Sequence, residues 1–380
     1  MRQIYLDYNA TTPIAPSVVE AMNPFLSGHF GNPSSSHVFG KAAKEAIEDA
    51  RVKVAGMLGC DREEVVFTGG GTESNNLAIK GVMMRGQPGS GHVVISAIEH
   101  PAVSEPVKFL ERLGYEVSIV GCDENGFIHP TAVEAELRSN TRLVSIMHAN
   151  NEIGTVQPIR QIAEICHGRG ILVHTDAAQT VGKIPTFVDQ LDVDLLTVAG
   201  HKFYGPKGIG VLFVREGVEL EPLLHGAAHE NGLRAGTENT PYIVGLGQAA
   251  HLAAHCLDES SDSMTRLRDR LNDRLANSIP GLLVNGARTQ RLPNTLSVIF
   301  PEVSGQEILQ RVPELCASTG SACHSSGLVS SATLAAMGRS EPEMAGTVRL
   351  SVGWYSSEEE IDRASNLLID AWENLVVSAH

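Results

Sequence analysis

Four segments of the sequence place reactive side chains directly after apolar runs of the kind that form buried strands. The runs are ILVHT, LLTVA, HVVIS and VVFT, and the residues that follow them are Asp176, Lys202, His100 and the pair Gly71 and Thr72. If these runs are strands of one parallel sheet, their carboxyl ends meet at one edge, where ligands of such proteins bind. We therefore treat these residues as candidates for a single site.

Each of these residues also has an ordinary structural explanation when it is considered alone. A glycine turn commonly joins a strand to a helix, although the free N–H groups at a helix start also suit a phosphate. Asp176 could cap the segment that follows it, and His100 could be a hydrogen-bonded turn residue. Lys202 could be a surface lysine, although desolvation would lower its pKa and allow its amine to form a Schiff base.

The combination is more informative than any one of its members. Pyridoxal phosphate requires a lysine amine for its aldehyde, a carboxylate that faces its pyridine nitrogen, and donors for its phosphate. Lys202, Asp176 and the turn at Gly71 and Thr72 supply these three groups. The sequence therefore predicts a pyridoxal phosphate site.

A cysteine lies in an unusual setting near the end of the chain. Cys323 is surrounded by small and polar residues in the segment TGSACHSSG. Structural cysteines are usually buried among large apolar residues, as expected for Cys166 on one face of a helix. Cys323 is thus either an incidental loop cysteine, which spacing alone favours, or a nucleophile on a loop that moves.

The elements that must position these residues alternate between strand-like and helical patterns. Strand-like segments are EEVVFT, HVVISAIEH, YEVSIVG, TRLVSIMHAN, GILVHTDAA, VDLLTVAG and GIGVLFV. Helical segments separate several of them, and a further helix is predicted over 34–58, with serines at its start as N-cap candidates. Apolar strands that alternate with helices indicate an α/β fold with a mostly parallel sheet.

The pattern changes after about residue 242. Two long helical patterns, at 243–257 and 264–279, precede strand-like NTLSVIF, helical GQEILQRV, strand-like VRLSVG and a final helix. Strands and helices that are mixed in this way predict a smaller α+β domain.

Composition excludes several classes of function. The net charge of −15 argues against direct nucleic-acid binding, which requires clustered Lys and Arg. The six cysteines form no CxxC pair, so we expect no metal site and no disulfide framework. No apolar run is long enough to span a membrane, and the first residues lack a secretory signal, so we expect a cytoplasmic protein without membrane contact.

Taken in order along the chain, the motifs resemble those of the cysteine desulfurases and the related selenocysteine lyases. The segments that carry the resemblance are YLDYNATTP, GNPSSSH, GGGTESNNLAIKG, MHANNEIGTVQPI, HTDAAQTVGK, GHKFYGPKGIG, RAGTENTP, GSACHSS and VRLSVG. These enzymes use pyridoxal phosphate and belong to the class V aminotransferase group. The resemblance implies the aspartate-aminotransferase-like fold (fold type I), with an arm at 1–12 packed on the small domain, a cofactor-binding large domain at 13–255 and a small domain at 256–380.

The resemblance also implies a role for each matching residue. Lys202 would bind the cofactor and shuttle the Cα proton, Asp176 would pair with the pyridine nitrogen, and His100 would stack on the ring and assist proton transfer. Gln179 would hydrogen-bond the phenolic oxygen. The other implied roles are phosphate binding by Gly71, Thr72, His201 and, from the second subunit, Thr237, and binding of the substrate carboxylate by Asn151 and Arg349.

For Cys323 the resemblance implies that its thiolate attacks the sulfur of the substrate L-cysteine, releases L-alanine and keeps the sulfur as a persulfide. The persulfide would pass to an acceptor protein, with iron–sulfur cluster assembly as the favoured pathway. His324 would either help to deprotonate a thiol or be a solvated loop histidine. The enzyme would be a homodimer with active sites at the subunit interface.

Three positions depart from the pattern of many cysteine desulfurases. Ala199 stands where a phosphate-binding serine is common, and Asn231 and Trp354 stand where arginines are common. Ala199, RAGTENTP and ACHS resemble the selenocysteine lyases, so that activity stays open beside cysteine desulfuration. An aminotransferase would leave Cys323 without a purpose, and the intact catalytic set argues against a partner-binding scaffold whose cofactor is only structural.

Overall fold

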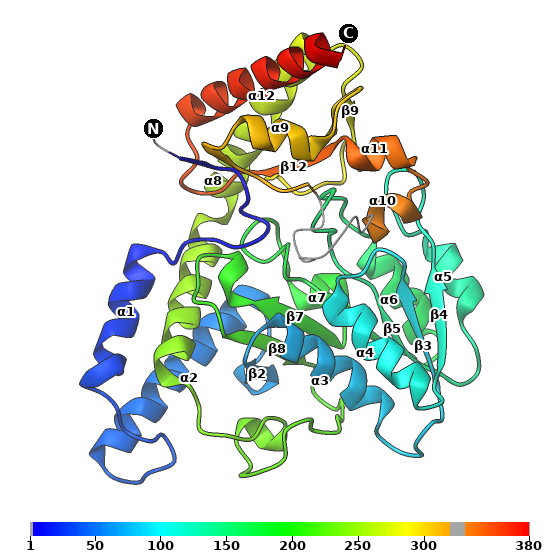
Figure 1. Ribbon diagram of the computed structural model, residues 1–380. Helices are drawn as coiled ribbons and strands as arrows, with labels where there is room; N and C mark the ends of the chain where they lie inside the picture. The colour runs from blue at the N-terminus through cyan, green and yellow to red at the C-terminus, as the bar shows by residue number, and fades with distance from the viewer. Residues whose placement is uncertain (1–2, 320–330, 380) are drawn as a thin grey trace.

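The computed structural model describes residues 3–319 and 331–379. Its largest sheet has seven strands in the order β2-β8-β7-β6-β5-β3-β4, and β8 alone runs against the others (Figure 1). The strands are β2 (Val65–Thr68), β3 (His92–Ser96), β4 (Glu116–Val120), β5 (Thr141–Ser145), β6 (Leu172–Asp176), β7 (Leu195–Ala199) and β8 (Gly210–Val214). The predicted α/β fold with a mostly parallel sheet is confirmed.

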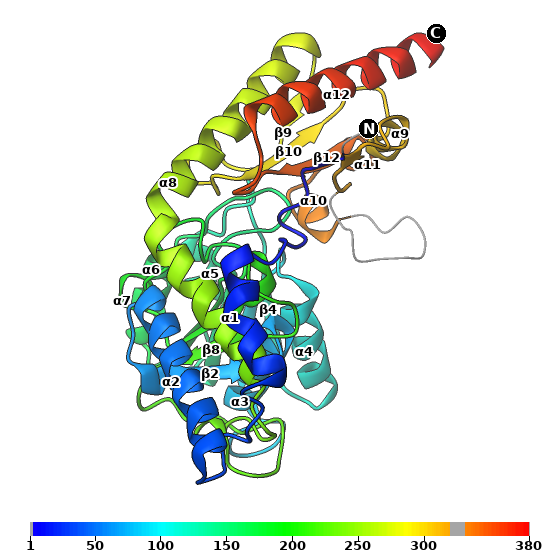
Figure 2. The ribbon, with the colours of Figure 1, turned by 90° about the vertical axis from the view of Figure 1, so that its left-hand side faces the viewer.

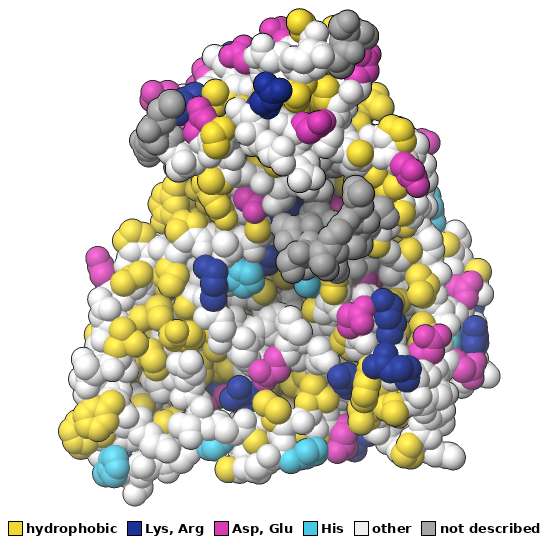
Figure 3. Space-filling model, viewed as in Figure 1, with side chains coloured by type: hydrophobic (Ala, Val, Ile, Leu, Met, Phe, Trp, Pro, Cys, Tyr) yellow, Lys and Arg dark blue, Asp and Glu magenta, His cyan; other side chains and the backbone are white. Residues whose placement is uncertain are grey.

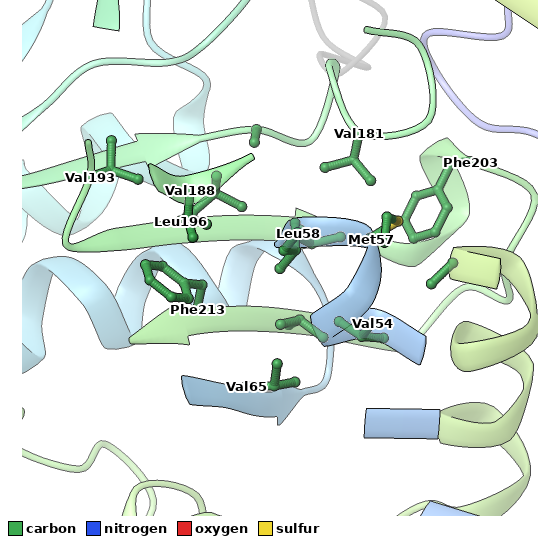
Figure 4. Packing of buried hydrophobic residues seen from close by; sticks show 14 of the residues in the cluster. Val54, Met57, Leu58, Val65, Val181, Val188, Val193, Leu196, Phe203 and Phe213 are labelled. Atoms are coloured by element: carbon green, nitrogen blue, oxygen red, sulfur yellow. The ribbon is translucent and has the colours of Figure 1, made fainter. Parts of the chain in front are cut away.

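Helices cover both faces of this sheet because successive strand residues point to opposite sides. In β7, Leu195 joins the cluster formed with α3 (Gly71–Met83) and α4 (Pro101–Arg112). Leu196 joins the larger cluster on the opposite face, part of which Figure 4 shows. The helices that contribute to the larger cluster are α1 (Pro16–Ser27), α2 (Val38–Leu58), α5 (Pro130–Glu136), α6 (Ile159–His167), α7 (Val188–Leu191) and the first part of α8 (Thr240–Ser278).

A second, smaller sheet lies above the first in Figure 1 and has the order β12-β10-β9. Its antiparallel strands are β9 (Leu283–Val284), β10 (Thr295–Ile299) and β12 (Thr347–Ser351). Near the N-terminus, β1 (Ile4–Tyr5) pairs in parallel with β11 (Leu315–Cys316). The helices of this region are α9 (Gly305–Arg311), α10 (Ala332–Ala336), α11 (Glu341–Ala345) and α12 (Glu358–Ala379).

One long helix, α8 (Thr240–Ser278), connects the two regions where the sequence pattern indicated two segments (Figure 2). Its apolar residues up to Ala253 belong to the large-sheet cluster, and those from Met264 belong to the small-sheet cluster. The polar stretch between them does not interrupt the helix, because Asp, Glu and Ser tolerate an exposed helical position. The proposed division at 255 falls between the two sets of contacts and stays a prediction.

The predicted start of α2 is wrong. The helix begins at Val38 instead of residue 34, and its N-cap is His37, whose Nδ1 accepts the N–H of Gly40 at 3.3 Å. The serines before it belong to a turn, in which Asn32 Oδ1 accepts the N–H of Ser34. The asparagine side chain competes for the backbone donors that would otherwise begin the helix.

Cys166 lies on α6 in the large apolar cluster, as predicted. Among residues 3–319 and 331–379, no helix has the length and apolar character needed to cross a membrane.

Candidate active site

Lys202 lies just beyond β7, in the short 3-10 helix η2 (Gly200–Lys202). Its Nζ donates hydrogen bonds to the carbonyl oxygens of Asn9 at 2.7 Å and Ala10 at 2.8 Å. Tyr204, two residues later, has a φ of 69° and donates its N–H to Thr12 Oγ1. The N-terminal segment therefore crosses the site and holds the lysine amine between two backbone acceptors.

Asp176 is the last residue of β6 and is almost fully buried. Its Oδ2 accepts the side-chain amide of Asn75, on α3, at 2.7 Å, and its Oδ1 accepts the N–H of Ala178 at 2.9 Å. The carboxylate thus caps the following turn, as its ordinary structural explanation predicted, and it also has a buried hydrogen-bond partner. Two fixed donors hold the carboxylate in one orientation.

Gln179 follows in the turn after β6, with its side chain buried. Its Nε2 donates to the carbonyl of Asn9 at 3.1 Å, which also accepts the amine of Lys202. Its Oε1 accepts Nζ of Lys183 at 3.0 Å. The amide nitrogen of Gln179 and the amine of Lys202 therefore converge on one oxygen.

His100 is the N-cap residue of α4, and its Nδ1 accepts the N–H of Ala102 at 3.0 Å. Burial lowers the pKa of its imidazole, and the nearby Lys202 lowers it further, while Asp176 opposes these effects. The ring is therefore neutral at pH 7. Because Nδ1 accepts a hydrogen bond, the ring proton is on Nε2.

The glycine turn after β2 gives α3 an N-terminus that faces the end of β7. Gly70 has a φ of 142°, which only glycine adopts readily. A Cβ at Gly71 would lie 3.2 Å from Cβ of Ala199, so the two backbones approach closely. Thr72 is exposed in the first turn of this helix. The free N–H groups of the helix start are suited to an anion.

His201 lies in η2, directly before Lys202, and contacts the N-terminal segment through Nδ1, 3.2 Å from Thr11 Oγ1. Burial, followed by the charge of Lys202, lowers the pKa of its imidazole to about 4. His201 is therefore a neutral hydrogen-bonding group at pH 7.

Thr237 is exposed on the loop that precedes α8. The flanking residues Gly236 and Glu238 line a cavity of about 70 Å³ together with Thr68 and Gly69 of the glycine turn. The structure therefore brings the loop of Thr237 next to the turn that contains Gly71.

Arg349 lies on β12 and is buried at the junction of the two sheets. Its Nη2 donates to Asp7 Oδ1 at 2.7 Å, and its Nη1 donates to the backbone carbonyl of Asn151 at 3.1 Å. Within the described part of the chain, its Nε is buried without a hydrogen-bond partner. Three of the five N–H groups of the guanidinium thus remain for a carboxylate.

Cys323 and His324 lie outside the described residues.

Several residues at the site were missed by the sequence reasoning. Asn9 is buried and contacts both regions: its carbonyl accepts from Lys202 Nζ, whereas its Nδ2 donates to Thr295 Oγ1 at 2.8 Å and its N–H donates to Ser351 Oγ at 3.0 Å. The other missed residues are Asp7, Asn75, Glu99 and Lys183. Asn9 and Asp7 lie in YLDYNATTP, where a cluster of polar residues behind a short apolar run was the available signal.

The donor set fits pyridoxal phosphate. Lys202 has an amine held for reaction, Asp176 has a fixed carboxylate, and the N-terminus of α3 supplies donors on a turn that a Cβ would crowd. Gln179 presents an amide N–H close to the lysine. These are the complementary groups for an aldehyde, a pyridine nitrogen, a phosphate and a phenolic oxygen.

The chain is similar to known proteins over almost all of its length. Residues 4–364 match the family model of the class V aminotransferases. A cysteine desulfurase IscS of Dictyoglomus turgidum is 45% identical over 377 residues, which cover 99% of this chain and 95% of that protein.

Two solved structures are also similar. A NifS-like protein has a TM-score of 0.91 at 37% identity, covering 99% of this chain and 100% of the other. The protein SspA in complex with cysteine has a TM-score of 0.83 at 39% identity, covering 93% of this chain and 99% of the other. This chain therefore belongs to the pyridoxal-phosphate-dependent cysteine desulfurases of the class V aminotransferase family.

Proposed function

We propose that this chain converts L-cysteine to L-alanine, takes the sulfur onto Cys323 as a persulfide and passes it to an acceptor protein. The observation that carries the proposal is the convergence of Lys202 and Gln179 on the carbonyl of Asn9, beside the fixed carboxylate of Asp176. The similarity to a cysteine desulfurase over nearly the whole chain supports the same activity.

In the first half of the reaction, each residue of the site has a separate role. Lys202 would hold pyridoxal phosphate, which would supply an electron sink for the substrate's Cα. Asp176 would keep the pyridine nitrogen protonated, and Arg349 would bind the substrate carboxylate through its remaining N–H groups. Lys202 moves the Cα proton, and His100 supplies a proton from Nε2.

The sulfur transfer requires a thiolate nucleophile. The thiolate of Cys323 attacks the sulfur of the substrate, so the S–S bond of the persulfide forms as the substrate's C–S bond breaks. The electron pair of the C–S bond stays with the three-carbon fragment. That fragment takes up a proton at the carbon that carried the sulfur, and it leaves as alanine, so no external oxidant or reductant is needed.

A homodimer is the proposed assembly, with Thr237 of each subunit contributing to the phosphate site of the other. Apolar side chains gather over α1 and the start of α2, at the lower left of Figure 3. Among them, Phe30 and Phe39 are 71% and 49% exposed and stack with ring centroids 5.5 Å apart. Exposed aromatic residues of this kind mark a protein interface.

The proposal also includes the protein that accepts the sulfur and the location of the enzyme in the cell. We infer that a scaffold of iron–sulfur cluster assembly receives the sulfur, in line with the IscS name of the relatives. With its net charge of −15, the enzyme would associate faster with a basic face on the acceptor. The cytoplasm stays the predicted location.

The decisive experiment measures alanine formation by the purified, cofactor-loaded protein from L-cysteine and from L-selenocysteine, with a thiol reductant present. We expect turnover of both substrates. Cys323→Ala should lower the rate with cysteine by about 100-fold or more, because the nucleophile is lost.

The matched control is Cys316→Ala, which removes a partly exposed thiol on β11 and should leave the rate unchanged. A wild-type enzyme that turned over selenocysteine but not cysteine would be a selenocysteine lyase, and the proposal would be wrong. A Cys323→Ala variant with the wild-type rate would remove Cys323 from the mechanism.

A further inference from the structure

Lys183 is a buried lysine that the proposed mechanism does not use. It follows β6 by seven residues, in the same turn as Gln179, and only 4% of its surface is exposed. Its Nζ donates to two oxygens of one residue, the carbonyl of Gln179 at 3.1 Å and Oε1 of Gln179 at 3.0 Å. Because lysine is almost never fully buried unless it is paired, Lys183 is expected to have a role in the site and not only to increase solubility.

The surroundings of Lys183 do not favour a positive charge. In the described ranges 3–319 and 331–379, its Nζ forms no ion pair with a carboxylate. Burial lowers its pKa to about 7, and the charges of Lys202 and Arg349 act in the same direction. A neutral amine still has two N–H groups, which suffice for its two hydrogen bonds. Donation to Gln179 therefore persists in either protonation state.

The orientation of the Gln179 amide decides what this residue can offer to a ligand. A glutamine amide has a donating and an accepting end of nearly the same shape. Lys183 donates to Oε1, and the carbonyl of Asn9 accepts from Nε2. The reverse orientation would set Nε2 against the donors of Lys183 and Oε1 against a carbonyl oxygen. Both neighbours thus select the same orientation.

The direction of Nε2 matters because of the chemistry of pyridoxal phosphate. The phenolic oxygen of this cofactor is attached to the ring carbon next to the one that bears the aldehyde. A donor beside the lysine that binds the aldehyde therefore faces this oxygen. Gln179 Nε2 and Lys202 Nζ share one acceptor, which places them side by side.

We propose that Lys183 is a positioning residue. By donating to Oε1 of Gln179, it holds the amide so that Nε2 is the group presented to the phenolic oxygen of the cofactor. The inference rests on the pyridoxal phosphate site of the proposed function and adds a residue that acts on the cofactor only through Gln179.

The test is a pH titration of the visible absorbance of the cofactor-loaded protein, which reports the pKa of the bound cofactor without any turnover. In Lys183→Met the amide loses one of the two neighbours that select its orientation, and only the carbonyl of Asn9 remains, so the donor to the phenolic oxygen is held less firmly. We expect the pKa of the bound cofactor to rise by about one unit, because hydrogen bonds to the anionic oxygen favour it.

A double-mutant cycle distinguishes an effect of Lys183 through the orientation of Gln179 from a direct effect of the charge of Lys183 on the cofactor. In a Gln179→Leu background, Lys183→Met should cause no further shift, because the residue through which it acts is absent. Lys207→Met is the charge control: this exposed lysine acts on His201 through its charge but forms no contact with Gln179, and it should leave the pKa unchanged.

Lys183→Gln retains N–H donors without the charge and should recover at least half of the shift. Equal shifts from Lys183→Met with and without Gln179, or no shift at all, would overturn the proposal. Should Lys183→Met fail to fold, a Lys183→Gln protein with the same pKa as Gln179→Leu would overturn it as well. Failure of the wild type to form alanine would contradict the proposed function and leave this comparison intact.

Discussion

At the scale of single residues, His100 shows how a backbone contact limits the chemistry of a side chain. Its Nδ1 accepts the N–H of Ala102 at the start of α4, and burial keeps the ring neutral. A neutral ring whose Nδ1 accepts carries its proton on Nε2, where it can be donated. This supports the proposed roles, in which His100 gives a proton during the reaction and Lys202 acts as the base.

The residue before it, Glu99, has an unusual carboxyl group. Its Oε1 accepts the hydroxyl of Ser96 at 2.5 Å and the N–H of Met147 at 2.9 Å, while Oε2 is buried with no partner in the described part of the chain. Burial raises the pKa of Glu99 to about 8. The folded protein therefore keeps this carboxyl protonated at pH 7, and the unfolded chain does not.

This difference predicts a pH-dependent stability. Between about pH 4.5 and 8 the folded state holds one more proton at Glu99 than the unfolded state, so its contribution to stability falls as the pH rises. Glu99→Gln keeps the acceptor for Ser96 and Met147 but does not titrate. The free energy of unfolding of wild type relative to Glu99→Gln should fall by on the order of 4 kcal/mol from pH 4.5 to 8.

Urea unfolding at several pH values measures this difference. Glu105→Gln, at an exposed position on α4, serves as the control and should give the same pH dependence as wild type. A constant difference between wild type and Glu99→Gln across this range would mean that Glu99 is ionised in the folded protein.

At the scale of elements, a buried ion pair holds the loop before α8 against the sheet. Both oxygens of Glu230 accept from the guanidinium of Arg51 at 2.8 Å, and Oε2 also accepts the N–H of Phe67 on β2. Glu230, Asn231 and Gly232 all have positive φ. Asparagine adopts this conformation more readily than arginine, which accounts physically for Asn231 in this chain.

Removal of one partner of this pair should be costly. Glu230→Gln leaves Arg51 with only the more exposed Glu48 as a carboxylate partner, and we expect a loss of about 3 kcal/mol in the free energy of unfolding, measured in urea. Glu48→Gln removes the other carboxylate that contacts Arg51, at 3.3 Å and with 40% of its side chain exposed. That control should cost less than about 1 kcal/mol. Equal losses in the two variants would contradict the assignment of the anchor to Glu230.

The strands of the large sheet were predictable because their order along the chain and their apolar runs are local properties. The start of α2 was not, since the turn at Asn32 competes with the serines for the first helical position. The continuity of α8 was also missed, because its burial changes from one apolar cluster to the other along its length.

Some residues of the candidate site could likewise be predicted from the sequence, and others could not. Lys202, Asp176 and the glycine turn could be identified from the sequence. Each combines a residue type suited to the cofactor with a position at the end of an apolar strand. Asn9 and Asp7 could not be placed from the sequence, because their partners, among them Thr295, Ser351 and Arg349, are about 300 residues distant. The pairing of β1 with β11 and the bridge between Asp7 and Ser351 help to bring the N-terminal segment over Lys202.

At the scale of the whole molecule, aromatic stacking joins the two regions. Trp354, after β12, stacks on Tyr204 with ring centroids 3.8 Å apart and an interplanar angle of 17°. The Tyr204 hydroxyl accepts the N–H of Trp354 at 2.6 Å. Tyr204 belongs to the large-sheet cluster, whereas Trp354 packs against both clusters. Trp354 thus joins the two regions by stacking on Tyr204. An arginine at this position would join them less strongly, because it presents less apolar area.

This contact predicts that the two regions unfold together only while Trp354 is present. Trp354→Ala should remove about 3 kcal/mol of stability and separate a single calorimetric transition into two, because it removes the aromatic stack from the contacts that couple the two regions. Trp372→Ala is the control, since Trp372 packs only in the small-sheet cluster, with Nε1 bonded to the carbonyl of Pro301 at 3.1 Å. It should weaken the small region without separating the transitions. A Trp354→Ala protein that still unfolds in one step would show that the other contacts between the regions, among them α8 and the hydrogen bond from Leu292 N–H to the Gly154 carbonyl, suffice to couple them.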